Sequence, residues 1–278
     1  SGAWLGARLN FREGSAPLGY IPGSNWTKVL CDGVSDLIER ASVRVRAGTS
    51  VVRLVGDGDS ITRVELDDGE SLAADLVVST VPTEIYRELL GESRPEFETI
   101  QYTAIVSAIF TTRQTIRPDF YWMNLASLDC NACGIFALNS LNPTIGGPGE
   151  TCLNIMSHVR SRKDTFFNQS DEQILGSYRA DFYRVFGFEL TPVWSRLNRL
   201  PMYSPVFYRG YRNPPLRDAR LRNVYLAGNY RTFPSIASTG TALRSGVETG
   251  AAILSDHGCT TDLPDAIGRF RLASMPKG

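Results

Sequence analysis

The stretch 221–254 constrains the fold of this chain more than any other, and it reads LRNVYLAGNYRTFPSIASTGTALRSGVETGAAIL. Its apolar run 224–227 has the β-branched and aromatic character of a buried strand. Gly228 and Asn229, which tolerate unusual backbone angles, end that strand. After a loop with Pro234, Ser238 or Thr239 stands where a helix N-cap belongs, and 242–254 continues without proline. The stretch therefore predicts a strand, a tight glycine turn, a loop and a capped helix.

A helix that starts directly after such a loop has a chemical use. Its first N–H groups are free and carry a partial positive charge, so they suit an anion or an electron-rich carbonyl. Many α/β proteins contain the same unit without a ligand, so a purely structural strand–turn–helix is the alternative.

The letters of this stretch resemble the C-terminal flavin-binding signature of the FAD-dependent amine oxidase superfamily, especially its protoporphyrinogen oxidase and carotenoid desaturase branch. That signature reads roughly L-A-G-D-Y-x-x-x-P-x-x-A-S-x-x-G-A-x-x-S-G. The positions that fit without a gap are Leu226, Ala227, Gly228, Tyr230, Pro234, Ala237, Ser238, Ala242, Ser245 and Gly246.

The resemblance implies two groups of cofactor-binding residues. In the family the first glycine and the acid after it approach the phosphates and the ribityl chain, which here implies Gly228 and Asn229. The helix N-terminus faces the pyrimidine ring of the flavin, which implies the backbone of Ser238, Thr239, Gly240 and Thr241. Asn229 replaces the usual acid, and Gly240-Thr241 replaces the usual Glu-Gly. Asparagine still donates and accepts hydrogen bonds.

The block 18–90 also resembles the middle segment of the superfamily, through GYIPG at 19–23 and ADLVVSTVP at 74–82. Between these motifs Ser24 can cap a helix, and glycine turns separate short strands at 43–45, 50–55, 61–66 and 71–73. A buried strand at 75–81 and a helix at 83–90 follow. In the family a valine backbone pairs with the adenine of FAD, and the matching position is Val51. An ordinary β-meander in which Val51 simply packs is the alternative.

From Arg94 onward the pattern changes to longer strands, near 102–111, 120–123, 134–138 and 152–157, followed by a helix at 171–186 that Ser170 caps. We interpret this segment as a substrate domain. The predicted fold class is mixed α/β (α+β): part of an FAD/NAD(P)-binding fold with an inserted mixed-sheet substrate domain. The FAD-binding domain would comprise 1–90 and 200–256, the substrate domain 91–199 and a C-terminal tail 257–278.

The dinucleotide-binding motif of such enzymes does not occur in this sequence. FAD enzymes of this class begin with a strand, G-x-G-x-x-G and a helix, which hold the pyrophosphate. We therefore expect a fragment of a larger protein, whose N-terminal FAD-binding half is removed or lies on another chain. FAD would then belong to the full-length protein, and the sequence leaves open whether this chain alone binds it.

Composition excludes several other classes. The net charge is zero, which disfavours nucleic acid, and the apolar runs are too short to span a membrane. Five irregularly spaced cysteines indicate reduced thiols in a cytoplasm. Only His158 and His257 are present, so a catalytic triad or a metal site is not expected. The lone C-x-x-C at 130–133 is interpreted as two structural thiols.

Two sequence differences from true amine oxidases make oxidation of a simple amine an unfavourable interpretation. Ser238 stands where they carry an aromatic residue over the flavin, and no lysine occupies the counterpart of their flavin-linked lysine. The resemblance thus favours a dehydrogenase or desaturase of a small organic molecule, with no catalytic residue assigned. A redox-neutral enzyme like UDP-galactopyranose mutase is one alternative, and it would need a pocket of arginines and tyrosines. A non-catalytic module that has lost FAD is the other.

Overall fold

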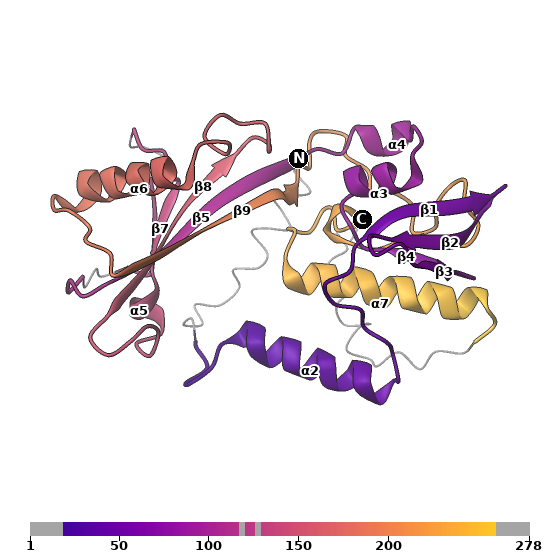
Figure 1. Ribbon diagram of the computed structural model, residues 1–278, viewed down its shortest axis with the longest axis horizontal. Helices are drawn as coiled ribbons and strands as arrows, with labels where there is room; N and C mark the ends of the chain where they lie inside the picture. Colours follow the sequence, from indigo (N-terminus) through magenta and orange to yellow (C-terminus); the bar gives the residue numbers. More distant parts are fainter. Residues whose placement is uncertain (1–18, 117–119, 126–128, 260–278) are drawn as a thin grey trace, which may run out of the picture. The chain divides into compact units, whose positions relative to one another are not determined.

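The computed structural model describes residues 19–116, 120–125 and 129–259, which form two compact units of mixed α/β structure (Figure 1). The first unit comprises 46–101 and 204–259. The second comprises 19–45 and the described residues of 102–203. The predicted mixed α/β class is confirmed. What each unit binds stays a prediction, and the expected tail lies outside the described residues from 260 onward.

The first unit contains a three-stranded antiparallel meander in the order β1 (Val51–Asp57), β2 (Ser60–Leu66) and β3 (Ser71–Ala73). Tight turns join the strands, and Gly58 in the first turn has φ +63°. The predicted hairpins are thus present. The predicted strand at 43–45 was wrong, because Val43 and Val45 are 55% and 68% exposed and pair with no described strand. Since this segment does not extend the sheet, β1 is an edge strand.

A second sheet in this unit pairs β4 (Val77–Ser79) with β10 (Val224–Leu226) in parallel. β10 is fully buried, whereas β4 is shorter and more exposed than predicted, with Val78 41% exposed. Val77 and Ser79 direct their backbone groups to β10, so Val78 directs its N–H and C=O to the opposite edge. No strand of the described chain pairs with that edge.

Helix α7 (Thr239–Asp256) packs on β10 through small polar residues. Ser245 and Thr249 are buried, and the Thr249 hydroxyl donates to the Leu226 carbonyl at 3.3 Å. At the other end of the helix Tyr225 donates to Asp256 at 2.5 Å. The opposite side of α7 exposes an apolar stripe of Leu243, Val247 and Leu254.

A buried ionic cluster fixes the chain before β10. Arg94, between α3 (Thr83–Leu90) and α4 (Pro95–Glu98), is fully buried and forms an ion pair with Asp218. Tyr86 donates to the same carboxylate at 2.8 Å. Burial alone would raise the pKa of Asp218, but the hydrogen bonds from Arg94, the Arg220 N–H and Tyr86 lower it below its ordinary value.

The second unit is built on a five-stranded sheet in the order β6-β7-β8-β5-β9. Helix α6 (Asp171–Phe186) packs on one face of it, capped by Ser170 as predicted. The core between them is apolar and includes Val106, Phe110, Leu153, Ile174 and Phe182. The strands and the remaining short helix are β5 (Tyr102–Thr112), β6 (Trp122–Asn124), β7 (Gly134–Ala137), α5 (Leu138–Leu141), β8 (Thr151–Val159) and β9 (Trp194–Pro205).

Helix α2 (Trp26–Arg40) forms where the sequence predicted a helix, but its details differ. Its N-cap is Asn25, whose side chain accepts from the Lys28 N–H at 2.8 Å, and not Ser24. None of its residues is buried, and Trp26 is 58% exposed. Across the described ranges, no helix combines the length and the hydrophobicity that crossing a bilayer requires.

Candidate functional site

The turn after β10 requires glycine at position 228. Gly228 has φ +146°, a backbone conformation that other residues rarely adopt. A Cβ on this residue would lie 2.8 Å from Cε1 of Tyr230. Its N–H donates to the Ser245 hydroxyl at 3.0 Å. Glycine is therefore needed because the ring of Tyr230 fills the space of a side chain at position 228, and a hydrogen bond fixes the turn to α7.

Asn229 begins the 3₁₀ turn η2 (Asn229–Arg231) and is half-buried. Its carbonyl accepts from the Thr232 N–H at 3.3 Å and from the Thr232 hydroxyl at 2.7 Å. Within the described chain the side-chain amide of Asn229 has no hydrogen-bond partner. The backbone of Asn229 is thus used by the fold, while its amide remains available to a ligand.

The start of α7 is held by a capping box between Ser238 and Thr241. The Thr241 N–H donates to the Ser238 hydroxyl at 3.3 Å, and the Ser238 N–H donates to the Thr241 hydroxyl at 2.9 Å. Thr241 thereby performs the role that glutamate or glutamine plays in the usual capping box. Both hydroxyls form hydrogen bonds within the helix start. Their contribution to ligand binding is therefore to hold that helix start in a fixed position.

Thr239 and Gly240 form the first turn of α7 and are exposed. Their N–H groups have no hydrogen-bond partner among the described residues, and nothing lies within 4 Å of the Cβ position of Gly240. The first turn also lacks acidic side chains, which would otherwise neutralise the positive end of the helix. This helix start can receive an anion or a carbonyl oxygen.

Arg231 stabilises the turn through hydrogen bonds to backbone carbonyls. Its Nε donates to the Pro214 carbonyl at 3.1 Å and its Nη1 to the Leu226 carbonyl at 3.1 Å. Burial lowers the pKa of Arg231. The guanidinium therefore connects two backbone segments, a structural role that the sequence did not indicate.

Val51 lies at the start of β1 and is 39% exposed. It stands opposite Leu66, and the pairing is irregular between Val51 and Arg53. Because β1 is an edge strand, part of its backbone points away from β2. No hydrogen bond joins Val51 to the Gly228 turn in the described chain. The structure thus connects Gly228 to α7, while the role expected of Val51 stays a prediction.

The described residues contain no candidate metal site, because no three of their histidine, cysteine or acidic side chains come together as metal ligands. The five cysteines are free thiols, including Cys130 and Cys133 of the C-x-x-C. Burial raises the pKa of both these thiols, which makes them less reactive.

Comparison with known proteins identifies the family. The profile of the family described as "Flavin containing amine oxidoreductase" matches residues 21–254. No curated protein sequence matches the chain.

Solved structures share the fold at low sequence identity. A putative protoporphyrinogen oxidase from Exiguobacterium sp. 255-15 is 18% identical with a TM-score of 0.69, over 82% of this chain and 51% of that one. A reduced UDP-galactopyranose mutase is 13% identical with a TM-score of 0.68, over 98% and 61%. An oxidoreductase from Methanosarcina mazei is 13% identical with a TM-score of 0.60, over 81% and 54%. The chain thus spans about half to three fifths of the length of these structures.

Proposed function

Because the chain belongs to the flavin containing amine oxidoreductase family, we propose that it supplies the flavin-ring side and the substrate side of an FAD-dependent dehydrogenase or desaturase. When bound, FAD would supply the two-electron acceptor for oxidation of a small organic molecule, and the protein would supply orientation and electrostatics. A cytoplasmic location is part of this proposal, and the five free thiols support it.

The observation that carries the proposal is the arrangement of the Gly228 turn and the start of α7. Glycine at position 228 lets the ring of Tyr230 pack directly against the turn, which holds the backbone in its unusual conformation. Ser245 ties that turn to the helix whose first N–H groups are open. A flavin fits such a site, since a helix start of positive partial charge favours the oxygen-rich edge of its pyrimidine ring.

Each residue has a separate part in this proposal. The backbone N–H groups of Thr239 and Gly240 would donate to the ring, with Ser238 and Thr241 holding them in place. The amide of Asn229 would bind ribityl or phosphate oxygens beside Gly228. The backbone of Val51 would pair with adenine. Neutral asparagine gives one negative charge less than the family's usual acid beside the phosphates.

Two surfaces of the first unit support a further polypeptide segment as partner. Parallel sheets are normally covered on both faces and extended at their edges, yet β4 offers the unpaired backbone of Val78. Helix α7 is apolar on its outer side as well, which is typical of a helix buried between layers. The proposed partner is a strand–glycine turn–helix segment that would hold the FAD pyrophosphate, on the same polypeptide or another.

A second candidate is a redox-neutral mutase reaction. The specific support is that the UDP-galactopyranose mutase structure aligns with 98% of this chain. The third candidate, a module that does not bind FAD, rests on Asn229 in place of the acid.

The test is the absorption spectrum of the purified full-length protein, followed by titration of the stripped protein with FAD. We expect flavin bands near those of free FAD and stoichiometric rebinding. Asn229→Ala should weaken FAD binding about tenfold, the loss of one good hydrogen bond. Asn213→Ala is the control, because that amide bonds the Phe233 carbonyl instead of facing a ligand. A colourless protein that ignores added FAD would contradict the proposal. Turnover of a UDP-sugar without an electron acceptor would favour the mutase.

A further inference from the structure

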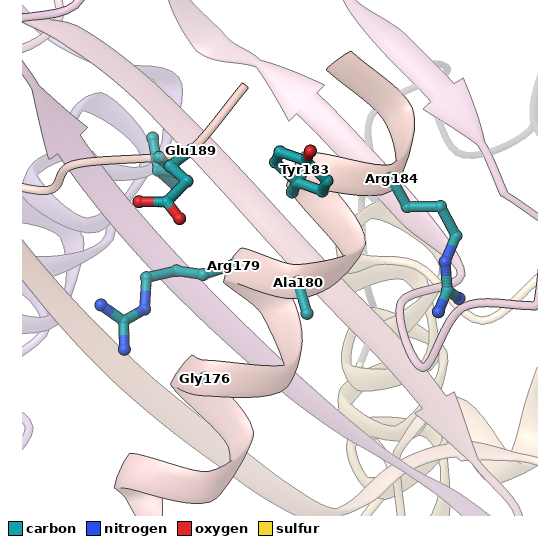
Figure 2. A pocket seen from close by; sticks show the side chains of 7 residues that line it. Gly176, Arg179, Ala180, Tyr183, Arg184 and Glu189 are labelled. Carbon is teal, nitrogen blue, oxygen red and sulfur yellow. The ribbon is translucent and has the colours of Figure 1, made fainter. Parts of the chain in front are cut away.

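A shallow hollow of about 630 Å³ lies on the face of α6 that points away from the sheet. Figure 2 shows Gly176, Arg179, Ala180 and Tyr183 along the helix, with Glu189 from the segment that follows it. Leu190 is 4% exposed and contributes the apolar floor. The hollow exists because Gly176 and Ala180 have almost no side chain.

The described chain itself gives no reason for glycine at position 176. Nothing lies within 4 Å of the place where its Cβ would stand. Glycine weakens a helix interior relative to alanine. The space it leaves is useful only if another molecule approaches the helix closely.

Two opposite charges border this hollow without an ion pair in the described chain. Arg179 and the carboxylate of Glu189 are both exposed, and neither makes a salt bridge or a side-chain hydrogen bond there. By contrast, neighbouring Arg184 lies 3.9 Å from Asp181 of the same helix. One free cation and one free anion on the same face make that face electrically self-complementary.

We infer that this face is the contact between two copies of the chain, with Arg179 of each copy paired with Glu189 of the other. A two-fold dimer uses the same patch on both subunits, so the two pairs form reciprocally. Tyr183 lines the same hollow as Arg179 and Glu189, so it would lie within this interface. This side chain is 54% exposed, and tyrosine is enriched in the centres of interfaces.

A second copy fits the hollow better than a small molecule does. Small-molecule sites enclose most of their ligand, whereas this hollow is open and bounded mainly by one helix. A bound ion would match only one of the two charges. Meeting its own copy satisfies both charges and places an adjacent helix where Gly176 and Ala180 leave room.

Sedimentation velocity over a range of concentrations and salt tests the inference on the full protein. The wild type should be a dimer whose dissociation constant rises with ionic strength. Arg179→Glu and Glu189→Arg should each weaken it about tenfold or more, since each places like charges together twice per dimer. The double variant R179E/E189R should return to within about threefold of the wild type.

The control is Arg160→Glu, which reverses an exposed arginine of the same unit that does not line the hollow and should leave the dimer unchanged. Circular dichroism and melting curves verify that every variant is folded. A wild type that is monomeric at all concentrations, or a double variant no better than the single ones, would overturn the inference.

A cross-link gives an answer that does not depend on the charge pairs. With the exposed Cys31 and Cys259 replaced by serine, Tyr183→Cys should form a disulfide-linked dimer under mild oxidation. Arg160→Cys in the same background should not. Equal cross-linking at both positions would also overturn the inference.

Discussion

The ring of Tyr230 lies so close to Gly228 that a Cβ on residue 228 would come within 2.8 Å of it. Gly228→Ala must therefore move the ring or the turn, in a backbone region that alanine rarely adopts. We expect a loss of about 2 kcal/mol or more in the free energy of unfolding, as for overpacked cores. Chemical denaturation measures it, and FAD affinity should fall in parallel.

The matched control for this change is Gly250→Ala in α7. Nothing lies within 4 Å of its Cβ position and its φ is not positive. Because alanine favours a helix interior over glycine, this variant should gain up to about 1 kcal/mol. Two variants that lose equal stability would contradict the account of the turn.

Asp218 is the fully buried counter-charge of Arg94, so Asp218→Asn should leave this cation with only the more exposed carboxylates of Glu96 and Glu92. Removing one partner of a buried ion pair costs about 3–5 kcal/mol, and we expect the lower end of this range because those two carboxylates remain. Tyr86→Phe, which removes only one hydrogen bond to the same carboxylate, should cost about 1–2 kcal/mol. Urea unfolding followed by fluorescence measures both. An asparagine variant no less stable than the phenylalanine variant would rule out this cluster as a source of stability.

The same cluster predicts how stability depends on pH. The folded-state pKa of Asp218 is below its ordinary value, so its contribution is complete above about pH 4, the pKa of an unfolded aspartate. It is lost as the pH falls through the lower, folded-state pKa. The free energy of unfolding should therefore decrease from pH 4 downward, with a shallower slope in Asp218→Asn. Parallel slopes would assign the acid sensitivity to other groups.

In the second unit, Tyr178 is buried and its hydroxyl lies 3.0 Å from the Val106 carbonyl and 2.9 Å from the Ser157 hydroxyl. Tyr178→Phe removes both contacts, although the Ser157 hydroxyl still donates to the Asn131 carbonyl, and should cost about 1–3 kcal/mol. Tyr203→Phe removes a hydroxyl from an exposed ring and should cost almost nothing. Thermal melts compare the two variants, and equal melting temperatures would refute the importance of this link between α6 and the sheet.

Elements with a long, uninterrupted pattern could be predicted closely from the sequence. Helices α3 and α6 have the predicted bounds, and β5 differs from its prediction by one residue. By contrast, β9 was not predicted, because Pro201 and Pro205 are typical of loops. The strand expected at 75–81 shrank to β4 because only three of its residues find a parallel partner.

The site was predictable in part for a related reason. Gly228, Asn229 and the capped helix are neighbours in sequence, so a local signature reveals them. The role of Ser245 depends on a hydrogen bond across 17 positions, and Arg94 meets Asp218 across 124. No periodicity encodes such partners. Ser245 is a position of the signature, so the sequence indicated the residue, but it did not indicate its hydrogen bond to Gly228.

The unpaired edge of β4 also affects the solubility of the purified polypeptide. An unpaired, apolar strand edge is a template for any extended backbone, including that of a misfolded neighbour. With this edge uncovered, the chain should aggregate through β4, and Val78→Lys should keep it in solution.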